Sequence, residues 1–313
     1  MIKSLTFIAI VLFITTVILI IQVSKLATEL SEKDTEEVTD KDNKRNAILI
    51  LAGVIAFFAF FLYQFFEYRE LLLPVAASEH GILIDRLLQV TFILIIIVFV
   101  ITHLLLGWFS FRYYSKKGRS AYFLTHNNKL EFVWTIIPTI VLSCLIIYGL
   151  KVWDNIMNPT SKDSMVIEVY AKQFQWLTRY PGNDKKLGNV SYKLIGGSNV
   201  IGLDSTDLRS WDDIITRELH LPVNKSVLMK FRSQDVIHSA YLPHFRVQMN
   251  CVPGMITQFQ FTPTITTEEM RRKTNNENFD YILLCNKICG VAHYSMKMKV
   301  VIEPEEDYKQ WLS

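Results

Sequence analysis

Residues 285–296 have the sequence Cys-Asn-Lys-Ile-Cys-Gly-Val-Ala-His-Tyr-Ser-Met. This stretch offers two thiols, Cys285 and Cys289, together with the imidazole of His293 and the thioether of Met296. Sulfur donors mixed with imidazole suit copper or zinc, whereas calcium and magnesium prefer oxygen ligands. The thioether favours copper, because structural zinc sites use Cys and His. The Cys-x3-Cys spacing also differs from that of a zinc knuckle, so we predict a copper site.

A further candidate ligand lies upstream, in the segment Asp235-Val-Ile-His238-Ser of another predicted strand region. Two thiolates that bridge two copper ions would give each ion a roughly four-coordinate site. The alternative is a disulfide between Cys285 and Cys289, which a location outside the cytoplasm would permit. His293 or Met296 taken singly would more often be a packing residue. The combination of all five residues at these spacings favours copper.

The sequence around these residues has the pattern of an all-β domain. Short segments rich in β-branched and aromatic residues are separated by turn signals, and 227–232 alternates apolar and polar residues. Segments of this length and spacing predict a β-sandwich or small barrel. Polar stretches at 181–213 and 263–278 are predicted insertions between strands. The predicted strands are 165–170, 174–178, 227–232, 255–261, 281–285 and 297–303.

The first half of the chain has a different character. Half of the 313 residues are hydrophobic and the mean hydropathy is +0.22, which favours a membrane protein. Lipid offers no hydrogen-bond partner to the backbone, so a long apolar run must be helical. A signal peptide is the alternative for residues 1–24, but the apolar run is long and lacks a clear cleavage site. Predicted membrane helices span 5–23, 47–66, 90–108 and 132–150.

Loop charges give an orientation for these helices. The connection between the third and fourth predicted spans carries five basic residues, Arg112, Lys116, Lys117, Arg119 and Lys129, against Glu131 alone. Such a loop is expected in the cytoplasm, which places the all-β domain outside, on the periplasmic side of a bacterial inner membrane. The loop at 24–45 has five basic and seven acidic residues, so it supports the orientation of the first span poorly.

Composition excludes some other classes of protein. The net charge of +3 and the lack of basic runs interleaved with aromatics argue against nucleic acid as a partner. Four cysteines in a chain of this length do not imply a disulfide framework. The sequence has no Cys-x-x-Cys-His motif, so we expect no covalent haem.

The combination of motifs resembles one known family. The run Cys-x-x-x-Cys-Gly-x-x-His-x-x-Met, preceded by Asp-Val-Ile-His-Ser and by Val252-Pro-Gly254, is similar to the copper A loop of cytochrome c oxidase subunit II. Glu131-Phe-Val-Trp134 is similar to the start of that family's second membrane helix, and Gln173-Phe-Gln-Trp176 to its aromatic motif. The likeness covers about residues 78–311. The first two predicted spans have no counterpart in the two-helix family pattern.

The resemblance implies a helical transmembrane anchor followed by a cupredoxin-like Greek-key domain that holds two coppers. It implies that Cys285 and Cys289 bridge both metals, that His238 and Met296 complete one copper, and that His293 and the Lys287 carbonyl complete the other. Electrons would come from a c-type cytochrome and pass to haem a in subunit I, which reduces oxygen and pumps protons. We therefore expect an extra N-terminal helix with a charged linker in 1–45, further membrane helices in 46–155, and the copper domain in 156–313.

Two family carboxylates are missing from this sequence. The family usually has Glu at the position of Lys287 and Asp at the position of Asn250, near a magnesium at the subunit I interface. Magnesium requires oxygen ligands, and an ammonium group beside it would repel it. We therefore expect a weakened or absent magnesium site, with Lys287 as a substitute positive charge.

The residues through which electrons would enter also depart from the family. Phe174 occupies the position that is often Trp, with Trp176 two residues later. From Lys151 onward the chain has 20 basic and 18 acidic side chains, so no strongly acidic face for a basic cytochrome is evident. A cytochrome held within a supercomplex would need less electrostatic steering than a diffusing one.

Glu131 has two interpretations. A carboxylate at the end of a membrane span is a functional candidate, and the resemblance places it near a proton-uptake path into subunit I. It would equally serve as a residue that caps the helix.

Three other functions remain open from the sequence. A quinol oxidase subunit II shares the fold but lacks copper, and retention of the ligands argues against it. A membrane-tethered copper carrier would not need two bridging thiolates. A nitrous or nitric oxide reductase would normally carry further catalytic modules.

Overall fold

The computed structural model describes residues 2–32, 38–157 and 164–313. The chain divides into two compact units, one of Met1–Gln64 with Phe99–Leu124 and one of Phe65–Val98 with Thr125–Ser313. Part of the charged linker expected within 1–45, and part of the start of the copper domain expected at 156, fall on 33–37 and 158–163, outside the described residues.

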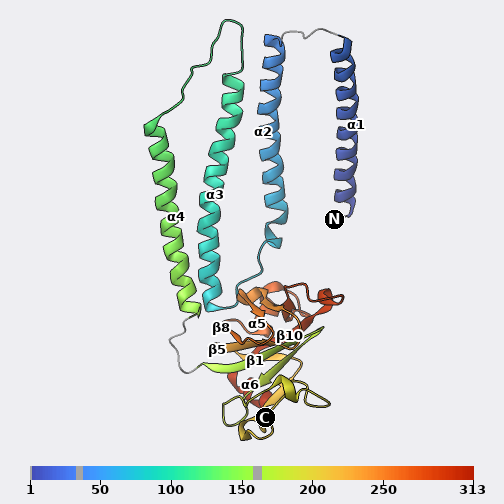
Figure 1. The fold of residues 1–313 in the computed structure, drawn as a ribbon, viewed down its shortest axis with the longest axis vertical. Coiled ribbons are helices and arrows are strands. Elements are labelled where there is room, and N and C mark those ends of the chain that lie inside the picture. The colour runs from blue at the N-terminus through green and yellow to red at the C-terminus, as the bar shows by residue number, and fades with distance from the viewer. Residues whose placement is uncertain (1, 33–37, 158–163) are drawn as a thin grey trace. The chain divides into compact units, whose positions relative to one another are not determined.

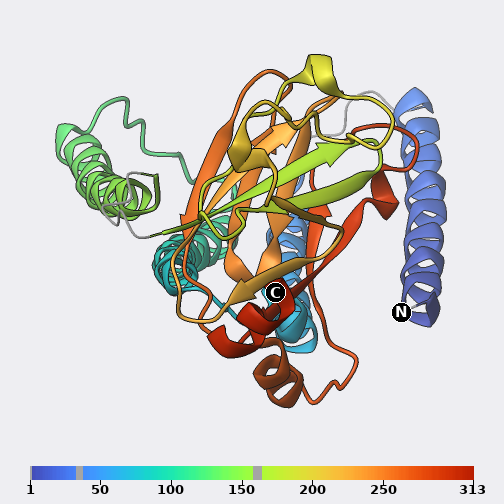
Figure 2. The same cartoon turned by 90° about the horizontal axis from the view of Figure 1, so that it is seen from below.

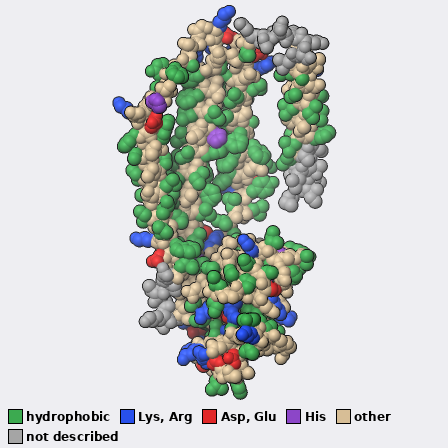
Figure 3. Space-filling model, in the orientation of Figure 1, with side chains coloured by type: hydrophobic (Ala, Val, Ile, Leu, Met, Phe, Trp, Pro, Cys, Tyr) green, Lys and Arg blue, Asp and Glu red, His purple; other side chains and the backbone are tan. Residues whose placement is uncertain are grey.

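The long helices are α1 (Ile2–Glu32), α2 (Asp40–Tyr68), α3 (Glu79–Arg112) and α4 (Asn128–Met157) (Figure 1). By length and composition, the described residues contain four helices able to cross a membrane. On the face seen in Figure 3, hydrophobic side chains are spread along the described parts of these helices, as expected where the surroundings are apolar. Each helix extends past its predicted apolar run, because the flanking polar residues continue the helical hydrogen bonding.

The second unit contains two five-stranded sheets (Figure 2). The strand orders are β3-β2-β1-β5-β8 and β4-β10-β9-β6-β7. In each sheet one pair is parallel, β1 with β5 and β4 with β10, and the other pairs are antiparallel. The strands are β1 (Met165–Lys172), β2 (Gln175–Tyr180), β3 (Ile214–Thr216), β4 (Leu219–Pro222), β5 (Val227–Ser233), β6 (His238–Leu242), β7 (Val247–Cys251), β8 (Thr257–Phe261), β9 (Tyr281–Cys285) and β10 (Lys297–Glu303).

A single hydrophobic core joins the two sheets. In β5 the buried residues Val227, Met229 and Phe231 alternate with more exposed neighbours, as the sequence predicted. They belong to the same buried cluster as Leu283 of β9 and Val300 of β10. This packing confirms the predicted fold class, a helical membrane region followed by a β-sandwich. All six predicted strands are present, and β6 lies in the predicted strand region at His238, whereas β3, β4 and β7 were not predicted.

The N-terminal part of α3 and the residues just before it are fastened to the sandwich within this unit. The amide of Ala77 donates to His244, and Ser78 forms a β-bridge with Pro263. The guanidinium of Arg246 donates from Nε and Nη2 to the two carboxylate oxygens of Asp85, at 2.8 and 2.9 Å. A bidentate pair of this kind fixes orientation as well as distance. These contacts therefore fix the start of α3 in one position relative to the sandwich.

The insertions and the C-terminus carry the remaining helices. Residues 181–213 are largely irregular, with short 3-10 helices η2 (Tyr192–Leu194) and η3 (Leu208–Ser210). Helix α5 (Thr267–Thr274) lies in the second predicted insertion, and the Thr266 hydroxyl caps it by accepting from the Glu269 amide. In α6 (Glu305–Leu312), the Trp311 ring stacks on His220 of β4 at 3.9 Å. This contact holds the C-terminal helix on the second sheet.

Candidate metal centre

The candidate ligands are brought together by the pairing of β6 with β9. Cys285 ends β9, where it pairs with Ala240, and the Asn286 amide donates to the Ser239 carbonyl at 2.9 Å. His238, the first residue of β6, is therefore placed beside Cys285. The Cys285 amide donates to the Met296 carbonyl at 3.1 Å, which closes the connection from β9 to β10. We call residues 285–296 the ligand loop.

The donor atoms of the ligand loop and His238 lie close together. The Cys285 and Cys289 sulfurs are 3.9 Å apart. Sγ of Cys285 lies 3.8 Å from Nδ1 of His238 and 3.2 Å from the Lys287 carbonyl oxygen. Sγ of Cys289 lies 3.6 Å from Nδ1 of His293 and 3.8 Å from Sδ of Met296. The donors of His238, Cys285 and Cys289 all fall within 4.8 Å of one another.

These spacings suit a shared metal better than a disulfide. Metal–ligand bonds of about 2.0–2.3 Å place two tetrahedral donors roughly 3.3–3.8 Å apart. A disulfide would require about 2.05 Å between the sulfurs. All four cysteines lie in the described part of the chain and are free thiols. The arrangement is therefore open to a soft metal, and its sulfur and imidazole donors fit copper.

Burial controls the protonation of the second thiol. Burial is the main cause that raises the pKa of Cys289 to about 11, and the neighbouring Cys285 adds to this increase. A thiol in this state holds its proton at neutral pH, and a bound metal displaces it. The site therefore needs a cation to carry two thiolates so close together.

A carboxylate orients the His238 ring. Nε2 of His238 lies 2.8 Å from Oδ1 of Asp235, which leaves Nδ1 directed toward the Cys285 sulfur. Partial burial raises the pKa of Asp235, but hydrogen bonds from the Gln173 amide and from His238 outweigh it and leave this pKa below its ordinary value. Such a partner fixes the tautomer of a metal-binding His. Sequence reasoning assigned Asp235 no role, although its position three residues before His238 was a usable signal.

The aromatic motif, residues 173–176, packs against the ligand loop. Trp176 is 2% exposed, and its indole N–H lies 3.4 Å from the Met296 carbonyl oxygen. The Gln173 side chain donates to the Cys289 carbonyl. Phe174 is half-buried against Gly290, where an added Cβ would lie 2.8 Å from its ring. Gln173 and Gly290 are further contributors to the site that sequence reasoning did not single out.

The side chains of the remaining predicted residues contribute no donor to this cluster. The side chains of Lys287 and Asn250 are exposed. Glu131 lies in the first turn of α4, where its carboxylate accepts from the Asn127 amide at 3.3 Å. Because 26 residues of helix at about 1.5 Å each separate it from the end of α4, Glu131 is roughly 40 Å from that end. The structure therefore does not bring Glu131 to the metal site.

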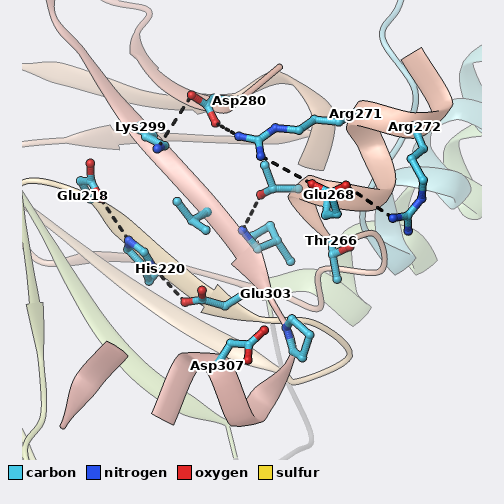
Figure 4. A pocket seen from close by; sticks show the side chains of 14 residues that line it. Glu218, His220, Thr266, Glu268, Arg271, Arg272, Asp280, Lys299, Glu303 and Asp307 are labelled. Carbon is cyan, nitrogen blue, oxygen red and sulfur yellow. Dashed lines mark hydrogen bonds and ion pairs between the residues drawn. The ribbon is translucent and has the colours of Figure 1, made fainter. Parts of the chain in front are cut away.

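A pocket away from the donor cluster lies in the second unit, between α5, β10 and β4 (Figure 4). Its volume is about 530 Å³. Arg271 pairs with Asp280 at 2.9 Å, and His220 lies 2.8 Å from Glu303. Ion pairs join Arg271, Arg272 and Lys299 to Glu268 and Asp280. None of the predicted site residues lines this pocket.

Fold and site together define a membrane-anchored β-sandwich protein with a loop of soft metal donors. The model for the cytochrome c oxidase subunit II transmembrane domain matches residues 66–152, and the model for the periplasmic domain of the same subunit matches 165–304. The chain is 35% identical, over 73% of its length and 79% of the relative's, to the alternative cytochrome c oxidase subunit 2 of Bradyrhizobium diazoefficiens. It is 28% identical to cytochrome c oxidase subunit 2 of Cereibacter sphaeroides, covering 71% and 73% of the two chains.

Among solved structures, the chain is similar to the periplasmic domain of cytochrome oxidase subunit II of Bradyrhizobium japonicum. The identity is 21% and the TM-score 0.33, over 49% of this chain and 93% of that one. The family models and the curated relatives place the chain in the cytochrome c oxidase subunit II family. It is thus a membrane protein with a periplasmic domain and a subunit of an oxidoreductase complex, which confirms the resemblance seen in the sequence.

The packing at Gly290 generates a prediction. In Gly290→Ala the new Cβ would lie 2.8 Å from both Gln173 Nε2 and the Phe174 ring, at a φ of +138° that L residues rarely adopt. The ligand loop must shift, so we expect copper bound per chain to fall by at least half, measured by elemental analysis of the purified protein. Gly196→Ala is the control, because its Cβ would meet nothing within 4 Å. Full copper in both variants would contradict the assignment.

Proposed function

We propose that this chain relays electrons through a binuclear copper A centre, from a c-type cytochrome to haem a of subunit I. Oxygen reduction to water and coupled proton pumping would take place in the larger subunit. The observation that carries the proposal is the convergence of three side-chain donors and one carbonyl around two free thiols. Family membership supports the same role.

The geometry supports a division of the donors between two coppers. Cys285 and Cys289 would bridge both ions. His238 lies beside Cys285 and Met296 beside Cys289, which suits one copper. The remaining donors, the Lys287 carbonyl beside Cys285 and His293 beside Cys289, suit the other. Each thiol thus has one partner from each pair.

The residues of this chain fit such a centre. When bound, a copper pair supplies a one-electron redox couple whose geometry change is spread over two metals. The protein's part is to hold the donors in one arrangement. Asp235 fixes His238, the Gln173 amide group fixes the carbonyl of Cys289, and the Trp176 indole fixes that of Met296. Burial of Cys289 and Met296 keeps water away from the sulfurs.

The outer face of the ligand loop supports docking of a partner protein. Ile288, Val291 and Tyr294 are 86%, 92% and 88% exposed, although they stand between ligands in the sequence. Exposed apolar side chains concentrated in one short loop are typical of protein contact sites. We propose that the cytochrome approaches over this loop and Phe174, while Trp176 is buried beneath it. The charge of the domain is nearly balanced. This suits a cytochrome that is held in a supercomplex and needs little electrostatic steering.

The membrane part supports the placement in a bacterial inner membrane. The family's transmembrane model covers α3 and most of α4, and α1 and α2 are also long and apolar enough to span. We propose four spans, with the basic connection between α3 and α4 in the cytoplasm. Contacts of α1 and α2 with further oxidase subunits would account for the two extra helices.

Copper content separates this proposal from its competitors. We expect about two coppers for each copy of this chain, counted apart from the copper of subunit I, and the seven-line electron-spin pattern of a mixed-valence pair. In Cys289→Ser a bridging thiolate is lost, so we expect the pattern to vanish and the copper to fall. Cys144→Ser, at an exposed membrane-helix cysteine, is the control and should keep both. One copper per chain would instead indicate a carrier, and none a quinol oxidase subunit.

Magnesium binding at the subunit I interface is expected to be weak or absent. The side chains of Lys287 and Asn250 supply no carboxylate, and an ammonium group repels a divalent cation. We therefore expect no manganese electron-spin signal at the subunit I interface of oxidase purified from manganese-grown cells. Lys287→Glu restores the family's carboxylate and should make the signal appear. A manganese signal from the unmodified enzyme would contradict this expectation.

For Glu131, proton uptake distinguishes the two interpretations. Its carboxylate accepts from the Asn127 amide, and the Asn127 side chain accepts from the Leu130 amide at 3.1 Å, which is a reciprocal helix cap. Gln at this position keeps an acceptor for the cap but cannot carry a proton. If Glu131 serves the uptake path, Glu131→Gln should slow proton uptake by about tenfold or more, in proteoliposomes. Unchanged uptake would leave capping as its role.

A further inference from the structure

The C-terminal end of α3 reaches the level of lipid headgroups. Asp85, near the start of this helix, binds Arg246 of the periplasmic domain. Arg112, the last residue of α3, comes 27 residues after Asp85, which is about 40 Å of helix at 1.5 Å per residue. A bilayer with its headgroup layers is about 40–45 Å thick. A helix of this length therefore carries Arg112 into the headgroup layer of the opposite leaflet.

The chain around Arg112 is basic and exposed. We call residues 112–124, where α3 ends and its connection to α4 begins (Figure 1), the basic segment. It contains no Asp or Glu. In the described part of the chain, none of its cations forms an ion pair with a carboxylate. The four exposed cations are Arg112, Lys116, Lys117 and Arg119.

A tight turn brings two of these cations together. The Arg119 amide donates to the Lys116 carbonyl at 3.1 Å, and Gly118 has the φ of +80° that the third position of a type II turn requires. Nη1 of Arg119 donates to the carbonyl of Arg112 at 3.3 Å. The guanidinium carbons of Arg112 and Arg119 lie 5.7 and 5.3 Å from the centre of the Tyr113 ring. Two guanidinium groups therefore share one aromatic ring.

This arrangement is suited to an anion. Like charges that are held close repel each other, and an anion between them removes this repulsion. A guanidinium has five N–H donors and binds phosphate through two of them at once. Arg119 uses one donor on the Arg112 carbonyl, and both side chains are otherwise exposed. Their remaining N–H groups are accessible to a phosphate from outside the chain.

The acidic groups nearest in the fold are already engaged. Asp40, in the first turn of α2, accepts from the backbone amide of Lys117 at 2.8 Å. Asp42 pairs with Arg45 at 3.3 Å. The sequence also has five acidic residues and one basic residue in 29–37, just before α2. This acidic stretch is the competitor within the chain for an external anion.

Apolar side chains follow the cations directly. Tyr122, Phe123 and Leu124 are 87%, 87% and 55% exposed. Exposed aromatic residues next to cations at the end of a membrane helix are typical of the boundary between lipid and water. A free phosphate ion offers these side chains no apolar contact, whereas the acyl chains of a phospholipid do. The combination favours a lipid over a small anion.

We propose that the basic segment binds an anionic phospholipid of the cytoplasmic leaflet. Arg112 and Arg119 bond to the phosphate, Lys116 adds a further positive charge, and Tyr122 and Phe123 contact the upper part of the acyl chains. Basic clusters at the cytoplasmic end of a membrane helix attract such lipids. The inference rests on the proposed orientation of the membrane helices. It is independent of the copper centre, with which it shares no residue.

Photochemical crosslinking in the purified oxidase complex tests this site. The complex is placed in phosphatidylcholine nanodiscs with a small amount of phosphatidylglycerol that carries a diazirine on one acyl chain. Mass spectrometry identifies the crosslinked residues. Each cation near an anionic headgroup contributes a factor of about five in affinity. We therefore expect labelling of residues 120–124 to be about tenfold stronger, or more, than with the same diazirine on phosphatidylcholine.

Variants assign the preference to the named cations. In Lys116→Gln/Arg119→Gln two charges are lost, so we expect the preference for phosphatidylglycerol to fall to about twofold or less. Gln at position 119 keeps a donor for the Arg112 carbonyl, so loss of that hydrogen bond is not the cause. Arg119→Lys keeps the charge and should keep most of the preference. Unchanged copper content and thermal unfolding verify that each variant is folded.

A matched control removes the same amount of charge elsewhere. Lys25 and Lys129 are exposed cations of α1 and α4, on the same side of the membrane in the proposed orientation. In Lys25→Gln/Lys129→Gln we expect the preference for phosphatidylglycerol to be unchanged. An equal fall in both double variants would show a general charge effect and would overturn the site.

The leaflet is tested separately. Ser120→Cys should react with a membrane-impermeant maleimide in inverted membrane vesicles, above the level of the unmodified chain. Reaction in intact cells with a permeable outer membrane would overturn the proposed orientation, and with it the leaflet named here. Equal crosslinking by the two lipid probes would overturn the lipid site while leaving the orientation intact, and would indicate that the acidic stretch covers the cations.

Two further results would assign the cations to another partner. Loss of crosslinking on addition of inorganic phosphate, at an ionic strength matched with sodium chloride, would indicate a site for free phosphate. Loss of another subunit from the complex in Lys116→Gln/Arg119→Gln, with an unchanged lipid preference, would indicate contact with an acidic protein surface. Either result would overturn the proposal.

Discussion

The antiparallel pairing of β6 with β9 is the constraint on which the candidate copper centre depends. His238 and Cys285 are 47 residues apart in the chain, and this ladder is what places their donor atoms 3.8 Å from each other. Two ligand-bearing segments that each carry too few donors for a binuclear site thus become one site. The sandwich core beneath, with Leu283 and Val300 fully buried, holds the ladder in register.

The same sandwich is tied to α3 and α4 by directional bonds and by buried contacts. Arg246 contacts Asp85 through two hydrogen bonds, and Val152 and Ile156 of α4 belong to the buried core. Bidentate ion pairs resist rotation, and buried aliphatic side chains resist separation. Within the second unit, the outer ends of α3 and α4 are therefore part of the folded domain.

Much of this architecture could be predicted from the sequence, because it rests on local patterns. Apolar runs predicted the long helices, alternation predicted strands such as β5, and the spacing of Cys285, Cys289, His293 and Met296 predicted the loop in which their donor atoms converge. What could not be predicted depends on contacts distant in the chain. β3 has only three residues and becomes a strand through pairing with β2. The role of Gly290 depends on Phe174, which a local pattern cannot place against it.

The amide of Cys285 bonds to the carbonyl of Met296, so the ligand loop begins and ends at a single closed neck. A segment closed in this way can vary in sequence while its two ends keep their positions. Substitutions inside it are expected to alter the set of candidate donors without changing which strands pair outside it. The sandwich and the metal chemistry are therefore free to evolve at different rates.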